Sequence, residues 1–210
     1  MRVVKQAEER RNEILDAADE LFGLKGFDGT STNNILEKVG IARGTLYHHF
    51  KSKEDIMDAL IERYSDRLLS AAQEIAIDKS IPVVERLTRV VMALNISGGG
   101  SKEMMEHIHK PQNALMHQKI QKVIVNGVPP ILTEIIREGI QQGMFSTPFP
   151  YECMEMVVIY ANTLFDDDDM ITLTNEERSS RMMAFIYNVE RLLGAESGSL
   201  MDVMKMPGSI

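Results

Sequence analysis

The sequence predicts an all-α protein in which a small N-terminal helix-turn-helix domain precedes a larger helical domain. Three features of the chain support this prediction. Apolar residues recur at helical spacing, with no alternating strand pattern to compete with them. Glycines and prolines divide the helical stretches at their expected ends. The segment 31–53 reads as two short helices joined at Gly40 and the start of a third, which is the layout of a helix-turn-helix.

The composition is that of a globular protein: the chain has 210 residues, of which 44% are hydrophobic and 26% charged. No apolar run approaches the roughly 18 to 20 residues that cross a bilayer. Charged residues from Arg2 onward take the place of an apolar signal segment. The single cysteine, Cys153, excludes an internal disulfide, as is typical of a reducing compartment. We therefore expect a cytoplasmic protein with no membrane contact.

The net charge of −8 is unevenly distributed along the chain. Residues 1–53 carry nine Lys and Arg against eight Asp and Glu, so the excess of negative charge lies in residues 54–210. An acidic domain attached to a nearly neutral DNA reader favours easy release from DNA over indiscriminate coating of it. Overall charge therefore neither supports nor excludes DNA binding.

The first expected helix spans about residues 8–25. Its apolar positions share one face; they are Ile14, Ala18, Leu21 and Phe22. Gly26 is placed to end this helix, and Ser31 to cap the second. The second helix should bury Ile35 and Val39 and stop at Gly40.

A third helix is expected from about Ala42 to His49, with Leu46 and Phe50 turned inward. Ser52 should cap a long fourth helix. The apolar stripe of that helix comprises Ile56, Leu60, Tyr64, Leu68 and Ile75.

Prolines and glycines set the remaining boundaries, with a flexible hinge at 98–101. Further helices are expected over about 82–96, to 109, from Pro111, up to Gly143, over 151–166 and over 175–194. Gly127 and Pro129–Pro130 should interrupt the helix that begins at Pro111, because proline removes a hydrogen bond. We divide the chain into a DNA-binding domain (1–53), a ligand-binding and dimerisation domain (54–194) and a flexible tail (195–210), giving nine or ten helices.

The outward face of the third helix carries groups that can read DNA. With Leu46 and Phe50 buried, the exposed residues are Arg43, Gly44, Thr45, Tyr47 and His48. Arg43 can bridge guanine O6 and N7, and Thr45 can touch a thymine methyl group or a phosphate. Gly44 allows close backbone approach. Alternatively, Tyr47 and His48 are only half-exposed packing of a small three-helix unit.

Phosphate contacts are expected beside this helix. Thr32 and Asn33 stand at the positive N-terminal end of the second helix, where they can donate to phosphate. Lys51 and Lys53 add positive charge where the fourth helix begins.

The run GTSTNNILEKVGIARGTLYHHFKSKED, residues 29–55, resembles the DNA-binding domain of the TetR/AcrR family of bacterial transcriptional regulators, over about residues 8–68. The resemblance implies operator contacts at Thr32, Asn33, Arg43, Gly44, Thr45, Tyr47, His48 and Lys53. Asn33 stands where the family often has arginine, and Ala42 where a serine usually caps the recognition helix. Losing such a cap typically costs about 1 kcal/mol.

A single helix-turn-helix reads too few base pairs to bind tightly, so we expect a homodimer. The last two helices are apolar over a wide arc and should pair with their symmetry mates, as the resemblance also implies. The interface residues are predicted to be Met154, Val158, Phe185, Val189 and Leu192. Alternatively, these side chains close the core of the monomer.

Fourteen of the fifteen methionines follow residue 53, and methionine suits cavities that accept varied apolar shapes. We predict a pocket for a small apolar or amphipathic effector. Its lining would comprise Met92, Asn95, Met104, Met105, His109, Met116, Tyr160 and Phe165. The alternative is that the methionines are irregular core filler.

A metal site and an enzyme are weaker interpretations. His107, His109, His117 and Cys153 lack the spacing of a metal site, and the aspartates 166–169 read as a solvated helix end. No nucleophile elbow or phosphate loop is present, so we expect no catalytic residue, cofactor or metal.

The expected function is therefore a homodimeric repressor that binds a palindromic operator and leaves it when the effector binds. An activator or co-repressor-type regulator of the same fold remains open, as does a helical metal-dependent enzyme.

Overall fold

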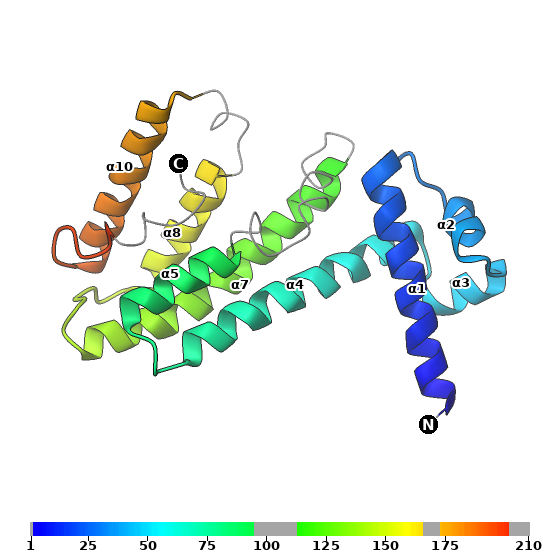
Figure 1. The fold of residues 1–210 in the computed structure, drawn as a ribbon, viewed down its shortest axis with the longest axis horizontal. Coiled ribbons are helices and arrows are strands. Elements are labelled where there is room, and N and C mark those ends of the chain that lie inside the picture. The colour runs from blue at the N-terminus through cyan, green and yellow to red at the C-terminus, as the bar shows by residue number, and fades with distance from the viewer. Residues whose placement is uncertain (1, 95–112, 166–172, 202–210) are drawn as a thin grey trace. The chain divides into compact units, whose positions relative to one another are not determined.

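The computed structural model describes residues 2–94, 113–165 and 173–201, giving the backbone alone for residues 2–6 and 165. All regular structure in these ranges is helical, as predicted (Figure 1). The helices are α1 (Arg2–Lys25), α2 (Thr32–Val39), α3 (Arg43–His49), α4 (Lys53–Ile77), α5 (Val83–Leu94), α7 (Ala114–Gln141), α8 (Pro150–Phe165) and α10 (Asn175–Leu193). No helix in the described ranges has the length and apolar character to cross a membrane.

The chain forms two compact units. The first, which we call the head unit, comprises Met1–Asp66 and Gly100–Ile120; the second, the body unit, comprises Arg67–Gly99 and Gln121–Ile210. Both α4 and α7 continue from one unit into the other. The head unit therefore reaches past residue 53, because it includes the first half of α4.

The core of the head unit is made by the inward faces of α1 to α4. α1 begins at Arg2, six residues earlier than the sequence predicted, and ends before Gly26, whose φ is 76°. Side chains buried in this core are Ile14, Leu15, Ala18, Phe22, Ile35, Leu46, Phe50, Ile56, Met57 and Leu60. Val39, predicted to be buried, is half-buried, because it lies at the last turn of α2 beside a groove.

Polar contacts of α1 fix its neighbours in the head unit. Asp16 accepts a hydrogen bond from Arg63 over 2.6 Å, and Asp19 accepts one from Tyr64, so α1 is tied to α4 at two successive turns. Burial, reinforced by Asp19, raises the pKa of the Tyr64 phenol.

The body unit is a helical bundle around a continuous apolar core. α5, α7, α8, α10 and the second half of α4 contribute to it. Its fully or nearly fully buried side chains include Ala72, Val83, Val90, Leu132, Ile135, Ile136, Met154, Val158, Ile186, Val189 and Leu193. In Figure 1, α8 and α10 lie side by side, in agreement with their direct contacts.

The predicted break at Gly127 and Pro129–Pro130 is wrong, because α7 runs without interruption from Ala114 to Gln141. Each proline costs the helix roughly 3 kcal/mol. Tertiary packing offsets that cost, because the turns on and after the prolines bury Val128, Ile131, Leu132, Ile135 and Ile136. Gly127 is also suited to its place, since a Cβ there would lie 2.6 Å from Leu69 Cδ1.

One buried arginine joins three helices of the body unit. Arg86 of α5 is 1% exposed; it donates to the Ala76 carbonyl oxygen at the end of α4 over 2.9 Å and pairs with Glu138 of α7. The positive charge complements the negative C-terminal end of α4. Removing Glu138 would leave the buried charge of Arg86 without its ion pair.

The flexible tail expected from Ala195 does not hold for residues 195–201. Ala195 and Leu200 are buried in the core of the body unit. The buried carboxylate of Glu190 accepts hydrogen bonds from the Gly198 and Leu200 amides, each over 2.9 Å. The polar composition of this stretch hid its two buried anchors.

Candidate nucleic-acid interface

The start of α2 is held by a capping box. The Ser31 hydroxyl accepts a hydrogen bond from the Asn34 amide over 3.2 Å, and the Asn34 side chain accepts one from the Ser31 amide over 3.0 Å. Thr32 and Asn33 follow directly, with Asn33 exposed and Thr32 half-exposed. Both lie at the positive end of the helix, as a phosphate contact requires.

Gly40 makes the turn between α2 and α3. Its φ is 72°, in the left-handed region that favours glycine, and its amide donates to the Leu36 carbonyl oxygen over 2.9 Å. This confirms the predicted turn, which directs the chain into α3.

α3 has one sealed face and one open face. Leu46 and Phe50 are buried in the head unit. The outward residues are Arg43, Gly44, Tyr47 and His48, all exposed, and Thr45, which is half-exposed. Four side chains with different hydrogen-bonding capacity, and the bare backbone of Gly44, therefore share one short helical surface, as direct readout in the major groove requires.

The cap of α3 is weak, as the departure at Ala42 predicted. Ala42 makes no side-chain hydrogen bond, and only its carbonyl oxygen accepts from the Thr45 and Leu46 amides. The first turn of α3 therefore presents backbone N–H groups that a phosphate oxygen can accept from.

Tyr47 links α2 and α3 on the exposed surface. The neighbouring Arg43 and Thr32 side chains favour the ionised form of Tyr47 and so lower the pKa of its phenol. The Arg43 guanidinium carbon also lies 5.6 Å from the centre of the Tyr47 ring. Three predicted DNA-contact residues thus lie next to one another on the exposed surface of α2 and α3.

Further positive charge gathers at the end of α3, which the sequence reasoning missed. Burial, together with the charges of His48, Arg10 and Arg11, lowers the pKa of His49. The Arg11 guanidinium carbon lies 5.2 Å from the centre of the Phe50 ring. No local pattern could reveal this cluster, because α1 and α3 are about forty residues apart in sequence.

The two lysines after α3 differ in their surroundings. The Lys51 side chain is exposed, and its amide donates to Asp55 over 2.8 Å. Lys53 is half-buried, and its ammonium donates to the Phe27 carbonyl oxygen over 2.6 Å. Ser52, as predicted, caps α4 by accepting from the Asp55 amide over 3.1 Å.

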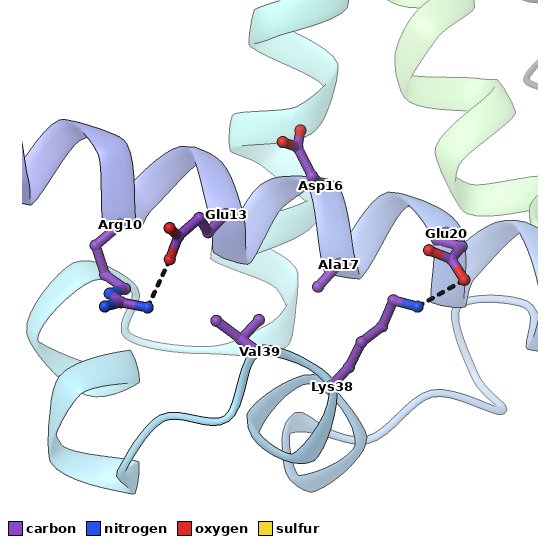
Figure 2. Close-up of a pocket in the computed structure, with 7 residues that line it drawn as sticks. All are labelled: Arg10, Glu13, Asp16, Ala17, Glu20, Lys38 and Val39. Carbon is purple, nitrogen blue, oxygen red and sulfur yellow. Dashed lines mark hydrogen bonds and ion pairs between the residues drawn. The ribbon is translucent and has the colours of Figure 1, made fainter.

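A groove of about 460 Å³ lies between α1 and the end of α2 (Figure 2). Two ion pairs line it, Arg10 with Glu13 over 2.5 Å and Lys38 with Glu20 over 2.6 Å. Its lining is Arg10, Glu13, Asp16, Ala17, Glu20, Lys38 and Val39. Such a charged groove differs from the apolar effector pocket that the sequence predicted.

The residues of that predicted pocket are distributed over both units. Met116 is buried in the head unit, whereas Met92 and Tyr160 belong to the body unit and are 38% and 54% exposed. Asn95, Met104, Met105 and His109, with the Phe165 side chain, lie outside the described residues. The effector pocket stays a prediction.

Three of the five predicted interface residues lie inside the monomer. Met154, Val158 and Val189 are buried in the core of the body unit, so they cannot also face a partner. Leu192 is exposed, and Phe185 is half-buried with its ring 5.8 Å from that of Tyr160. The helices α8 and α10 are apolar on two sides, and most of the predicted interface residues lie on the inward side.

Their outward sides carry a second apolar set, which we call the α8–α10 outer face. It comprises Met156, Ile159 and Tyr160 of α8 with Met183 and Tyr187 of α10, all exposed. Exposed apolar side chains gathered on neighbouring helices are typical of an interaction surface.

Within the described ranges, no three His, Cys, Asp or Glu side chains gather to hold a metal ion. His107, His109 and the aspartates 166–169 lie outside those ranges. The Cys153 thiol is buried and donates to the Leu192 carbonyl oxygen over 3.4 Å.

Comparison with known proteins connects this geometry to a family. Residues 14–60 match the model described as "Bacterial regulatory proteins, tetR family", and residues 97–187 match "Tetracyclin repressor-like, C-terminal domain". The matched N-terminal segment contains all of α2 and α3.

Curated relatives agree with both matches. The chain is similar to the HTH-type transcriptional repressor KstR2 of Mycobacterium tuberculosis, with 29% identity over 69% of this chain and 73% of the relative. It is also similar to the HTH-type transcriptional regulator UidR of Escherichia coli, with 30% identity over 67% and 71%.

Among solved structures, that of SmeT, the repressor of the Stenotrophomonas maltophilia multidrug efflux pump SmeDEF, shares the fold. Its TM-score is 0.65, with 19% identity over 90% of this chain and 91% of that one. The chain belongs to the TetR family of bacterial regulatory proteins and is a DNA-binding transcriptional regulator.

Proposed function

We propose that this regulator is a homodimeric repressor that binds a palindromic operator and leaves it when a small apolar or amphipathic effector binds. The observation that carries the proposal is the division of α3 into a buried face, Leu46 and Phe50, and an exposed polar face. A surface helix that served only packing would not need to expose arginine, tyrosine and histidine side by side.

The exposed face has the chemistry of base reading. Arg43 is placed to bridge guanine O6 and N7, and Thr45 to touch a thymine methyl group. Tyr47 and His48 reach phosphate or base edges, while Gly44 lets the backbone approach. Thr32, Asn33, Lys51 and Lys53 then act on the phosphates, which position the protein without reading sequence.

We infer dimerisation from the small number of base pairs that one head unit can contact. A single recognition helix contacts few base pairs, and two copies about 34 Å apart read successive turns of the same side of the duplex. The α8–α10 outer face supplies the surface for a two-fold partner, because its apolar side chains would otherwise stay in water. This assignment replaces the inward residues predicted from the sequence.

Repression and release are the regulatory part of the proposal. The relatives named as repressors support repression, and the methionine-rich sequence after residue 53 supports an apolar effector. An effector can shift DNA affinity only by binding one shape of the body unit better than the other. α4 continues from the head unit into the body unit, so a change of body shape has a covalent route to the heads.

We assign the chain no enzymatic activity, since its family and relatives are regulators. The proposed place of action is the bacterial cytoplasm, where operator DNA is found.

The test is selection from a random duplex library by the purified full-length protein. We expect a recovered palindrome with half-sites about one turn apart, bound by two chains per duplex and weakened by salt. Recovery of no preferred sequence would refute operator binding. A reporter gene placed behind the selected site then shows how the regulator affects transcription. Reduced expression means repression, and increased expression means activation.

A further inference from the structure

A short stretch at the start of α7 folds with the head unit. Residues 113–120 belong to the head unit, although the C-terminal family match covers 97–187 and α7 continues into the body unit. α7 therefore begins in the head unit and continues, beyond residue 120, into the body unit. We call residues 113–120 the docking turn.

The docking turn is anchored by Asn113, which is 2% exposed. Its side-chain oxygen accepts a hydrogen bond from the Phe27 amide over 3.0 Å, and its side-chain nitrogen donates to the Phe22 carbonyl oxygen over 3.2 Å. Phe22 lies in the last turns of α1, and Phe27 follows Gly26 in the connection to α2. One amide side chain therefore spans the end of α1 and the start of the α1–α2 connection.

The same connection is fixed from its other sides. Lys53 holds the Phe27 carbonyl oxygen, and the Phe22 and Phe27 rings lie 5.3 Å apart. The buried Thr30 hydroxyl donates to the Leu21 and Gly26 carbonyl oxygens, over 3.1 and 2.8 Å. Asn113 is the member of this set that comes from outside the helix-turn-helix and the start of α4.

The connection determines where the DNA-contact residues begin. Thr30 is followed at once by the capping residue Ser31 and by Thr32, whose side chain neighbours Tyr47. A displacement at Phe27 would therefore move the start of α2 and loosen the Thr32–Tyr47–Arg43 set. A shift of this kind at one head spoils the spacing of both heads on the duplex.

The other contacts of the docking turn also lie in the head unit. Met116 is buried there, and the Lys119 ammonium pairs with Asp58 on the exposed side of α4. Asp58 is far more exposed than Asn113, so the Lys119 pair should contribute little. Asn113 and Met116 carry the docking.

We infer that Asn113 is a positioning residue that couples α7 to the DNA-reading surface by holding the α1–α2 connection at Phe27. This role presupposes the operator binding proposed above. In addition to that function, it assigns Asn113 as a residue through which a change in the effector-binding domain is transmitted to the head unit.

The first test needs no effector. Coupling between two sites is reciprocal, so DNA that binds to the head unit must also affect the part of α7 that lies in the body unit. We would measure hydrogen exchange of the full-length protein with and without the duplex that it selects from a random library. We expect slower exchange of the Phe27 amide and of α7 amides beyond residue 120. If DNA left the exchange of the α7 amides unchanged, Asn113 would not couple α7 to the DNA-reading surface.

The second test replaces the side chain. Asn113→Leu keeps its size but makes no hydrogen bond, and Lys119→Ala is the control from the same turn. If the competent form of the head falls to about a tenth of the population, operator affinity falls about tenfold. We expect this for Asn113→Leu, with faster exchange at Phe27 and no DNA-induced change beyond residue 120, and wild-type behaviour for Lys119→Ala.

Two outcomes separate the possible failures. Should the wild-type chain select no duplex, the proposed function fails. Should it select one, and Asn113→Leu bind that duplex with wild-type affinity and wild-type exchange at Phe27, operator binding stands and the positioning role of Asn113 is refuted.

Discussion

The ammonium of Lys53 donates to the carbonyl oxygen of Phe27 over 2.6 Å and lies 4.1 Å from the centre of the Phe27 ring. A lysine predicted to meet phosphate thus also holds the connection between α1 and α2. The sequence could not show this, because the two residues are 26 positions apart.

Lys53→Ala should therefore destabilise the protein, by about 1–2 kcal/mol for one hydrogen bond and one cation–π contact. Urea unfolding would show it as a lower midpoint with an unchanged slope. Lys51→Ala is the matched control: its exposed side chain should leave the midpoint unchanged and reduce the salt slope of DNA binding by about one. An unchanged midpoint for Lys53→Ala would contradict the role of the Phe27 contact.

Arg43→Ala and Tyr47→Ala should abolish preference for the selected operator while leaving the dimer folded, because both side chains are exposed. Competition between operator and scrambled duplex, with thermal unfolding as the folding control, measures both effects. Tyr47→Phe removes only the phenol oxygen and keeps the ring beside Arg43, so it should lose part of the preference. Wild-type discrimination in all three variants would mean that α3 presents another face to DNA.

Gly44→Ala should change stability and DNA binding in opposite directions. A Cβ at this position would lie in open space beside the helix, and alanine stabilises a helix by up to about 1 kcal/mol relative to glycine. The unfolding midpoint should therefore rise, whereas operator affinity should fall, because the added methyl group lies on the surface that approaches the bases. Undiminished affinity would show that the backbone at Gly44 stays clear of DNA.

DNA binding should strengthen as the pH falls toward 6. Burial and the charges of His48, Arg10 and Arg11 lower the pKa of His49 in the free protein, and nearby phosphates would raise it. The complex then binds more protons than the free protein, so affinity rises as pH falls, by up to about tenfold per unit of pKa difference. Anisotropy titrations at constant ionic strength would measure it, and His49→Gln should flatten the dependence. An equal slope in His49→Gln would exclude this histidine as its source.

Local sequence signals predicted the head unit well. The cap at Ser31, the turn at Gly40 and the inward pair Leu46 and Phe50 depend on residues within one or two turns of each other. The same holds for the missing cap at Ala42. Such features are set by the backbone nearby and need no knowledge of distant contacts.

Features that depend on distant packing were not predictable in the same way. Pro129 and Pro130 read as a break, yet the buried face around them keeps α7 continuous. Asn113 carries no local signal at all, because its partners are 86 and 91 positions away. Helical spacing identified α8 and α10 as apolar but could not say which of their two apolar sides faces the core.

That last ambiguity leads to a test of the dimer. Ile159 and Tyr187 are exposed on the α8–α10 outer face, whereas Met154, Val158 and Val189 fill the core. Ile159→Glu combined with Tyr187→Glu places two charges on each partner at the proposed interface. Burying these carboxylates costs several kcal/mol per charge. A dimer whose interface consists of apolar contacts should therefore dissociate.

We expect this double variant to sediment as one chain while keeping its helical content, and to lose the tight operator complex that needs two heads. Leu24→Glu is the control: it places one charge on an exposed apolar residue of α1, outside the α8–α10 outer face, and should remain a dimer. A double variant that still sediments as two chains would show that the partner covers another surface, and the outer face would then need a different occupant.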